Sequence, residues 1–159
     1  MKKILIVLIV SLLSILIIDN NFYCTAQNQY QDNGIWINNV GDKDINVIIK
    51  DISIVAEKVK LRRDYDKYAI VTMEVYNTSL DYVDLSNINL KVYQDNNTLE
   101  TFIKSNESEY VGFVGRLESG ENKTIKVCIA VNNQKIPLKL VFSNIEAMKD
   151  NQKTKLIYL

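Results

Sequence analysis

Histidine is absent from all 159 residues of the sequence. It is the commonest general base and metal ligand in proteins, and it activates the nucleophile in Ser-His and Cys-His pairs. Its absence excludes most hydrolase mechanisms and removes the usual zinc ligand. We therefore expect a protein that is not an enzyme and that needs no cofactor.

Cysteine is also scarce, with only Cys24 and Cys128 in the chain. If Cys24 is removed with a leader, one thiol remains and no internal disulfide can form, so stability must come from packing. Cys128 lies between Lys126 and Ala130 in a strand-like pattern, and an activated thiolate needs a helix N-terminus or a cationic partner in a cleft. We interpret Cys128 as structural.

The sequence has no excess of either charge, with 19 basic and 19 acidic residues. Proteins that bind duplex DNA or RNA usually carry a strong positive excess that neutralises phosphates. The balance therefore argues against nucleic acid as a partner.

An export signal is predicted at residues 1–26. Lys2 and Lys3 precede an apolar run from Ile4 to Ile18, and small residues end the segment at Cys24-Thr25-Ala26. A basic start, an apolar core and small residues before a cleavage site are the three parts of a secretion signal. We expect the rest of the chain to be extracellular or at the cell surface.

Three fates of this segment stay open. Cleavage after Ala26 fits the requirement for small residues. An uncleaved membrane anchor is the second, although the apolar run is shorter than the ~20 residues that usually span a bilayer. The third is lipidation at Cys24, whose preceding residues 21–23 lack the pattern that lipidation normally requires.

Residues 27–44 are rich in Asn, Gln, Asp and Gly and predict a polar lead-in or tether. Only Ile35-Trp36-Ile37 interrupts it, as a first edge strand or as a plug on the end of the domain. Residues 45–159 are expected to form one domain.

Apolar residues alternate with polar ones along this domain, which predicts half-buried β-strands. The residues expected to point inward are Ala69, Val71, Met73 and Val75, then Ile88, Leu90 and Val92, then Ile125, Val127, Ile129 and Val131, and finally Leu138, Leu140 and Phe142. Because no helical segment is available to cover the strands, we expect two packed sheets. The predicted fold is all-β, an immunoglobulin-like β-sandwich of about seven or eight strands.

The first long strand, residues 45–59, changes parity. Its inward residues are odd-numbered up to Ile49 and even-numbered from Ile52 onward. One extra residue near Lys50-Asp51 would form a β-bulge, or the strand crosses between sheets at that point. We expect this strand to lie at a sheet edge.

Three segments resemble a known family: Val75-Tyr76-Asn77-Thr78-Ser79, then Leu85 with Ile88 to Gln94, and Leu117-Glu118-Ser119-Gly120-Glu121 before a strand. Over approximately residues 45–144 the chain is similar to the immunoprotective-extracellular-protein-like domains. The resemblance implies an immunoglobulin-like sandwich exported by Gram-positive bacteria, some relatives being lipoproteins, and it implies no catalytic residues. Many relatives have proline directly before the glycine, where this chain has Ser119.

Paired carboxylates, Asp42 with Asp44, Asp64 with Asp66 and Asp81 with Asp84, have the ligand chemistry of calcium sites. The first pair begins like an EF-hand loop but has Val47 in place of the required glycine. We interpret all three pairs as solvated turn residues.

Two groups of residues form the predicted contact surface. One is the basic concentration Lys58, Lys60, Arg62 and Arg63, which has the charge to hold an anionic envelope component. The other is the outward-facing set Tyr68, Tyr76 and Tyr93, since tyrosine supplies large amphipathic contact area.

The sequence therefore predicts an exported, non-enzymatic binding or interaction domain of the bacterial cell envelope or secreted fraction. Its partner is an unidentified protein or envelope component. The alternatives are a membrane-held structural or sensory ectodomain and a weak calcium-binding or glycan-binding module.

Overall fold

The computed structural model describes residues 34–38, 44–104, 112–145 and 152–159. Within these ranges the one helical segment is a short 3-10 turn, η1 (Leu85–Asn87), and no helix is long and apolar enough to cross a membrane. The predicted export signal at residues 1–26 lies outside the described residues.

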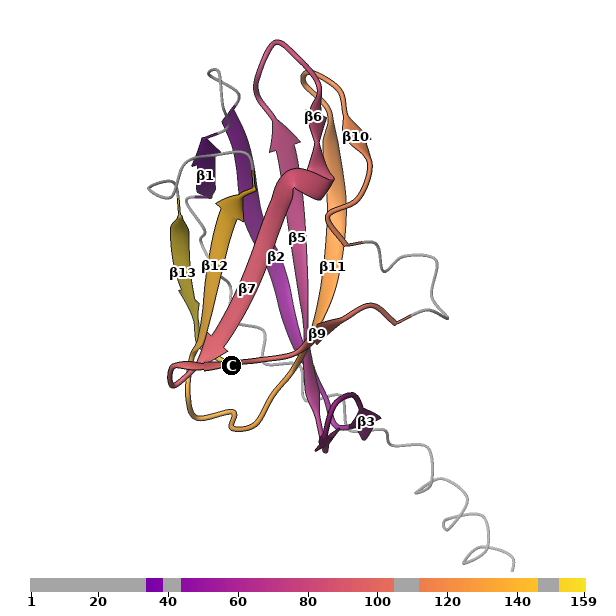
Figure 1. The fold of residues 1–159 in the computed structure, drawn as a ribbon, viewed down its shortest axis with the longest axis vertical. Coiled ribbons are helices and arrows are strands. Elements are labelled where there is room, and N and C mark those ends of the chain that lie inside the picture. The colour runs from indigo at the N-terminus through magenta and orange to yellow at the C-terminus, as the bar shows by residue number, and fades with distance from the viewer. Residues whose placement is uncertain (1–33, 39–43, 105–111, 146–151) are drawn as a thin grey trace, which may run out of the picture.

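Two antiparallel sheets form the body of the molecule (Figure 1). The larger sheet contains, in spatial order, β1 (Ile35–Asn38), β2 (Asp44–Val55), β5 (Tyr68–Asn77), β11 (Asn122–Ala130) and β9 (Thr101–Phe102). The smaller contains β13 (Lys153–Ile157), β12 (Leu138–Asn144), β7 (Ile88–Gln94) and β8 (Asn97–Thr98). Two short ribbons pair β6 (Val83–Asp84) with β10 (Arg116–Leu117) and β3 (Val59–Lys60) with β4 (Asp64–Tyr65).

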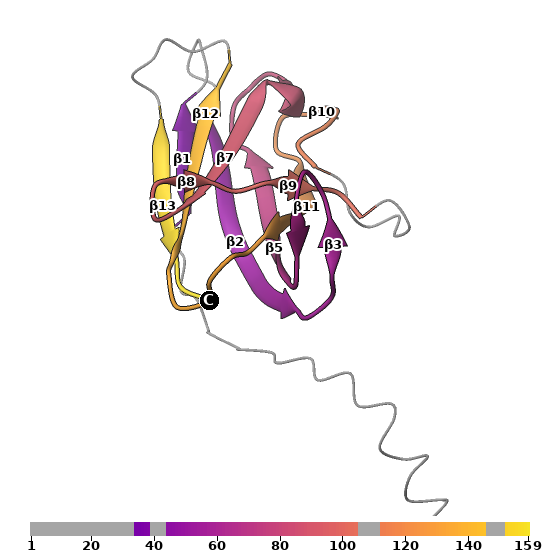
Figure 2. The same ribbon diagram turned by 60° about the horizontal axis from the view of Figure 1, so that its bottom comes forward.

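The order of the strands matches the immunoglobulin arrangement. In that fold strands A, B, E and D form one sheet and C, F and G form the other. Here β2, β5, β11 and β9 occupy the first four positions, and β7, β12 and β13 occupy the other three. The sheets lie face to face (Figure 2). The predicted immunoglobulin-like β-sandwich is confirmed, with β1 and β8 as additional strands.

The core lies between the two sheets and consists of the side chains that the alternation placed inward. Their exposed fractions are close to zero along β5 and β12, and Val127 at 7% is the most exposed of the inward residues of β11. Leu90 on β7 is only half-buried, because it lies near the open side of the sandwich. Burial of such a continuous apolar layer supplies the main stabilisation of the fold.

The parity change in β2 is a β-bulge. Ile49 pairs with Met73 and Asp51 pairs with Thr72, so Lys50 is the extra residue. The bulge keeps Ile49 and Ile52 on the core side. The expectation that this strand forms a sheet edge is wrong for residues 44–47, because β1 pairs along their outer side.

We expected the domain to start at Ile45. The larger sheet begins upstream of that residue, because β1 lies within residues 27–44. Of the two interpretations of the apolar patch at residues 35–37, the structure shows the edge strand. The strand forms because Ile35 is buried against the core at 7% exposure.

The short strands differ in part from expectation. The expected strand at residues 99–103 is reduced to β9, and residues 112–114, the described part of the expected strand at 110–114, form no strand. The turn between β7 and β8 contains Asp95 and Asn96 with φ of 49° and 64°. A two-residue turn with both φ positive matches the twist of the two strands, and Asp and Asn tolerate that conformation.

We predict that deletion of Lys50 lowers the free energy of unfolding by no more than about 1 kcal/mol. The deletion removes the bulge and one exposed ion pair with Glu74, but the same side chains of β2 still point into the core. Deletion of Ile48 is the control. It forces inward residues such as Val47 outward or brings Lys50 inward, and we expect it to cost roughly 3 kcal/mol or more. Urea unfolding of both variants measures the difference, and equal losses would contradict this account of the bulge.

Candidate functional site

The three tyrosines predicted to belong to a contact surface do not come together. Tyr68 and Tyr76 lie at opposite ends of β5, separated by eight residues of strand or about 26 Å. Tyr93 is on β7, in the other sheet. No single face therefore presents the three tyrosines.

Tyr68 is a buried clamp, with only 2% of its surface exposed. Its hydroxyl donates to Glu57 Oε2 at 2.9 Å, and Lys104 Nζ donates to both Tyr68 Oη and Glu57 Oε2 at 3.1 Å. The Tyr68 ring packs edge-on against Phe102, with ring centroids 5.3 Å apart. These contacts hold the end of β2, the start of β5 and the segment after β9 together.

The charges in this clamp reinforce one another. Hydrogen bonds from Lys104 and then Tyr68 lower the pKa of Glu57 below its ordinary value of 4.5. The pKa of Lys104 is raised, first by its hydrogen bond with Tyr68 and then by Glu57. Both groups are therefore ionised near neutral pH, and Lys104 is unsuited to act as a nucleophile.

The predicted basic residues lie in or beside one short ribbon, β3–β4. Lys60 pairs with Asp64 across the ribbon, so these opposite charges share one face. Arg63 lies over the Tyr65 ring at 4.9 Å and its Nε donates to Tyr65 Oη at 2.6 Å. Lys58 and Arg62 are exposed beside them.

The carboxylate pairs show no cation site in the part of the chain that the structure describes, where no three acidic or cysteine residues are grouped as metal ligands. Asp84 instead caps η1, because its Oδ1 accepts hydrogen bonds from the Ser86 amide and hydroxyl. Asp42 lies outside the described residues.

Asn77 organises the opposite end of the molecule. Its side chain is 1% exposed, and Nδ2 donates to the carbonyls of Asp81 at 2.7 Å and Leu117 at 3.0 Å. Its Oδ1 accepts from the Ser79 amide at 3.0 Å and from the Ser79 hydroxyl at 2.6 Å. Its backbone amide donates to the Glu121 carbonyl, and its carbonyl accepts from the Gly120 amide.

A serine from the neighbouring turn completes this network. Ser119 Oγ donates to the Ser79 carbonyl at 2.6 Å, and Ser79 Oγ also donates to the Asp81 carbonyl at 2.8 Å. The turn at residues 118–121 uses Gly120 at φ 75°, a conformation that favours glycine. The loop at 78–82 and the turn at 118–121 are thus fixed side by side.

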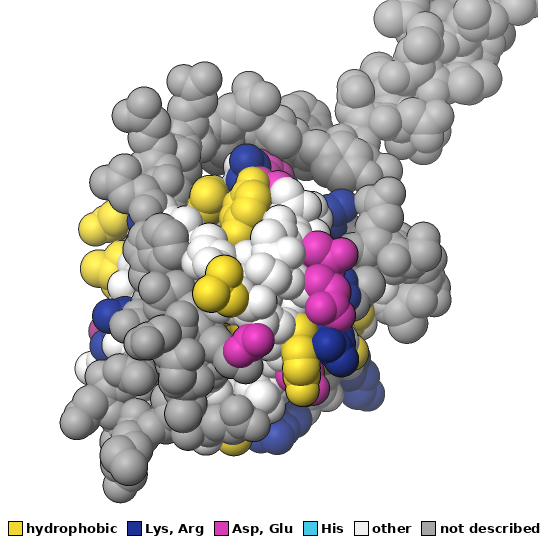
Figure 3. All heavy atoms as spheres, turned by 90° about the horizontal axis from the view of Figure 1, so that it is seen from above, with side chains coloured by type: hydrophobic (Ala, Val, Ile, Leu, Met, Phe, Trp, Pro, Cys, Tyr) yellow, Lys and Arg dark blue, Asp and Glu magenta, His cyan; other side chains and the backbone are white. Residues whose placement is uncertain are grey.

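Three exposed side chains project from this fixed end, and we call them the Leu80 tip: Leu80, Tyr82 and Arg116. Leu80 is 97% exposed and Tyr82 is 48% exposed. The Arg116 guanidinium carbon lies 3.5 Å from the centre of the Tyr82 ring, a cation–π contact. Seen from above, this end shows hydrophobic side chains next to charged ones (Figure 3).

The Leu80 tip was missed by the sequence analysis, although one signal existed. Leu80 interrupts an otherwise polar turn between Ser79 and Asp81, where an apolar residue has no strand period to follow. The position of Arg116 beside Tyr82 depends on the pairing of β10 with β6, which the sequence alone does not give.

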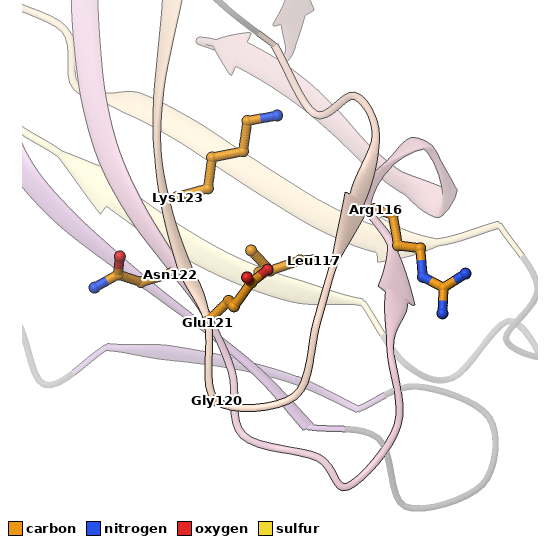
Figure 4. Close-up of a pocket in the computed structure, with 6 residues that line it drawn as sticks. All are labelled: Arg116, Leu117, Gly120, Glu121, Asn122 and Lys123. Atoms are coloured by element: carbon orange, nitrogen blue, oxygen red, sulfur yellow. The ribbon is translucent and has the colours of Figure 1, made fainter.

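A shallow, mostly polar hollow of about 550 Å³ adjoins the tip, and its walls are the two arms of the β10–β11 turn (Figure 4). Arg116 Nε forms an ion pair with Glu118 Oε1 at 2.7 Å, and Lys123 Nζ donates to the Val114 carbonyl at 2.8 Å. Both cations that line the hollow are therefore already engaged, and the hollow alone offers little to a ligand.

A second hollow of about 480 Å³ opens on the side of the sandwich. Its lining is mainly apolar and includes Leu90, Ile103 and Val127. Phe113, also in the lining, packs edge-on against Phe142 of the core with ring centroids 6.2 Å apart. Among the described residues that line this hollow, Thr101 supplies the one polar side chain, which is too little to orient a ligand.

No protein-family model matches the chain, and no curated protein matches it in sequence. Similar solved structures include a candidate lipoprotein of Bacillus subtilis, with a TM-score of 0.54 and 17% identity over 72% of this chain. The chain spans 36% of the length of that structure. An uncharacterised β-sandwich protein of Clostridium difficile gives a TM-score of 0.46 and 15% identity over 77% of this chain and 89% of its own. The Bacillus likeness shows that the two proteins share a fold.

We predict that Asn77→Ala lowers the free energy of unfolding by about 2–4 kcal/mol, because the buried Leu117 carbonyl loses this donor and the Ser79 amide and hydroxyl lose their acceptor. Asn132→Ala, at an exposed position in another turn, is the matched control and should change stability by less than about 0.5 kcal/mol. Urea unfolding tests both. Equal stabilities of the two variants would show that Asn77 does not organise this end.

We also predict a pH-dependent role of Glu57. Because its pKa is lower in the folded state, the unfolded chain binds the proton first as the pH falls. The stabilisation is therefore present above the ordinary pKa of 4.5 and is lost as the pH falls through the folded-state pKa. The stability difference between the wild type and Glu57→Gln, measured by urea unfolding at several pH values, should shrink in that range. If the difference in unfolding free energy between the wild type and Glu57→Gln stayed constant from neutral to acid pH, the ionised Glu57 would not stabilise the fold through Tyr68 and Lys104.

Proposed function

We propose that the protein is an exported, non-enzymatic binding domain of the immunoglobulin-like class, which contacts another protein through the Leu80 tip. The observation that carries this proposal is an almost fully exposed leucine on a loop that buried hydrogen bonds hold in place. A leucine side chain gains about 1.5–3 kcal/mol when it moves from water into an apolar site. Within the described part of the chain, no apolar site buries the Leu80 side chain.

The fixed loop favours binding, because a contact residue on a rigid loop loses little conformational entropy when a partner docks. Within the described residues, the Asn77 side chain donates two hydrogen bonds and accepts two, and these order the loop before a partner binds. A flexible loop would instead have to be ordered at that moment.

The composition of the tip also supports a contact role. Tyrosine and arginine are enriched among the residues that dominate binding energy at protein interfaces. Stacking of Arg116 on Tyr82 holds both in one orientation and presents a flat surface next to Leu80.

The proposed location is the cell surface or the secreted fraction of a Gram-positive bacterium. It is supported by the signal-like pattern of residues 1–26 and by a structural neighbour described as a candidate lipoprotein. We also propose membership of the immunoprotective-extracellular-protein-like family. In support, two of the three segments that carry the resemblance, around Asn77 and at 117–121, bind each other directly.

We predict that Leu80→Ser abolishes retention of a partner from envelope extracts or culture fluid of the source cells while the free energy of unfolding changes by less than about 0.5 kcal/mol. Tyr82→Ala and Arg116→Ala should weaken retention. Leu156→Thr is the matched control, since Leu156 is 47% exposed on β13, and it should retain the partner fully. Pull-down with the immobilised protein measures retention. Full retention by Leu80→Ser would refute the proposed contact surface.

A further inference from the structure

Acidic side chains border the Leu80 tip. The exposed carboxylates on its two loops are Asp81, Asp84, Glu118 and Glu121. Within the described residues of these loops the cations are Arg116 and Lys123, so the border carries a net charge of about −2. Figure 3 shows acidic side chains beside the exposed hydrophobic ones at this end.

Hydrogen bonds hold two of these carboxylates, Asp84 and Glu121, in place near the tip. Hydrogen bonds from the Ser86 hydroxyl and amide lower the pKa of Asp84. Glu121 Oε2 accepts from the Glu118 amide at 2.9 Å, which holds that side chain over its own turn. The Ser119–Ser79 hydrogen bond keeps this turn against the loop that carries Leu80.

The two cations are held by contacts within these loops, and together they offset only two of the four carboxylates. Arg116 is paired with Glu118 and stacked on Tyr82, and Lys123 donates to a backbone carbonyl. An approaching partner therefore meets an exposed apolar side chain on loops whose described residues carry net negative charge.

We infer that the partner is a protein with an apolar recess of about leucine size bordered by lysine or arginine side chains. The inference rests on the proposed function and adds the chemistry of the partner. An anionic membrane surface is disfavoured, because its headgroups would be repelled by the same carboxylates that attract a basic border. The carboxylates act mainly on the rate of association, since charges at the rim of an interface steer the encounter.

The test compares two double variants that each remove two negative charges. Asp81→Asn with Glu121→Gln neutralises the border with side chains of the same shape. Asp64→Asn with Asp66→Asn removes the same charge at the β3–β4 ribbon, at the other end of the molecule (Figure 1). The association rate is measured with the immobilised protein and an envelope protein extract, at low and at high salt. A second arm uses vesicles of phosphatidylcholine and phosphatidylglycerol.

We expect the border variant to associate roughly tenfold more slowly at low salt, with little difference at high salt, while the ribbon variant matches the wild type. Equal rates for the two double variants, combined with loss of binding in Leu80→Ser, would overturn the basic-bordered partner and leave the proposed function standing. Binding that Leu80→Ser does not reduce would overturn both. Binding to the vesicles that depends on Leu80 would overturn the inference in favour of a membrane.

Discussion

The amide of Asn77 is the constraint on which the functional end of this molecule depends. β5 leaves the sheet at Asn77, and the chain must reverse there while its polar groups stay buried. A buried carbonyl without a donor is costly, and the Asn77 amide donates to the buried Leu117 carbonyl. It also shares the Asp81 carbonyl with Ser79 and accepts two more hydrogen bonds. The loop therefore has one stable shape, and that shape leaves Leu80 in solvent.

The two ends of the sandwich use polar networks for opposite purposes. At the β3–β4 end, Glu57 and Lys104 cover Tyr68 and remove an aromatic ring from solvent. At the other end, Asn77 fixes a loop that displays apolar and aromatic side chains. Hydrogen bonds thus bury an aromatic side chain at the β3–β4 end and hold apolar side chains in solvent at the other end. For this reason we propose that recognition occurs at the Leu80 tip.

Much of the fold could be predicted from the sequence, because strand periodicity is a local property. The alternation identified the inward residues of β5, and the parity change located the bulge at Lys50. The contact surface could not be predicted in the same way. An outward position on a strand does not reveal what covers it: Tyr68 is covered by groups 11 and 36 residues away in sequence.

Ser119 makes a hydrogen bond that proline, the residue often found at this position in the domains that this chain resembles, could not make. Many of the domains that this chain resembles have proline at the corresponding position, and proline has no hydroxyl or amide to donate. Here the serine hydroxyl donates to the Ser79 carbonyl at 2.6 Å and links the 118–121 turn to the loop that carries Leu80. Compared with a proline at this position, serine gives less local stiffness and adds a bond between two turns. That bond adds to the Asn77 hydrogen bonds that already join the two turns, and so further restrains the position of Leu80 relative to the 118–121 turn.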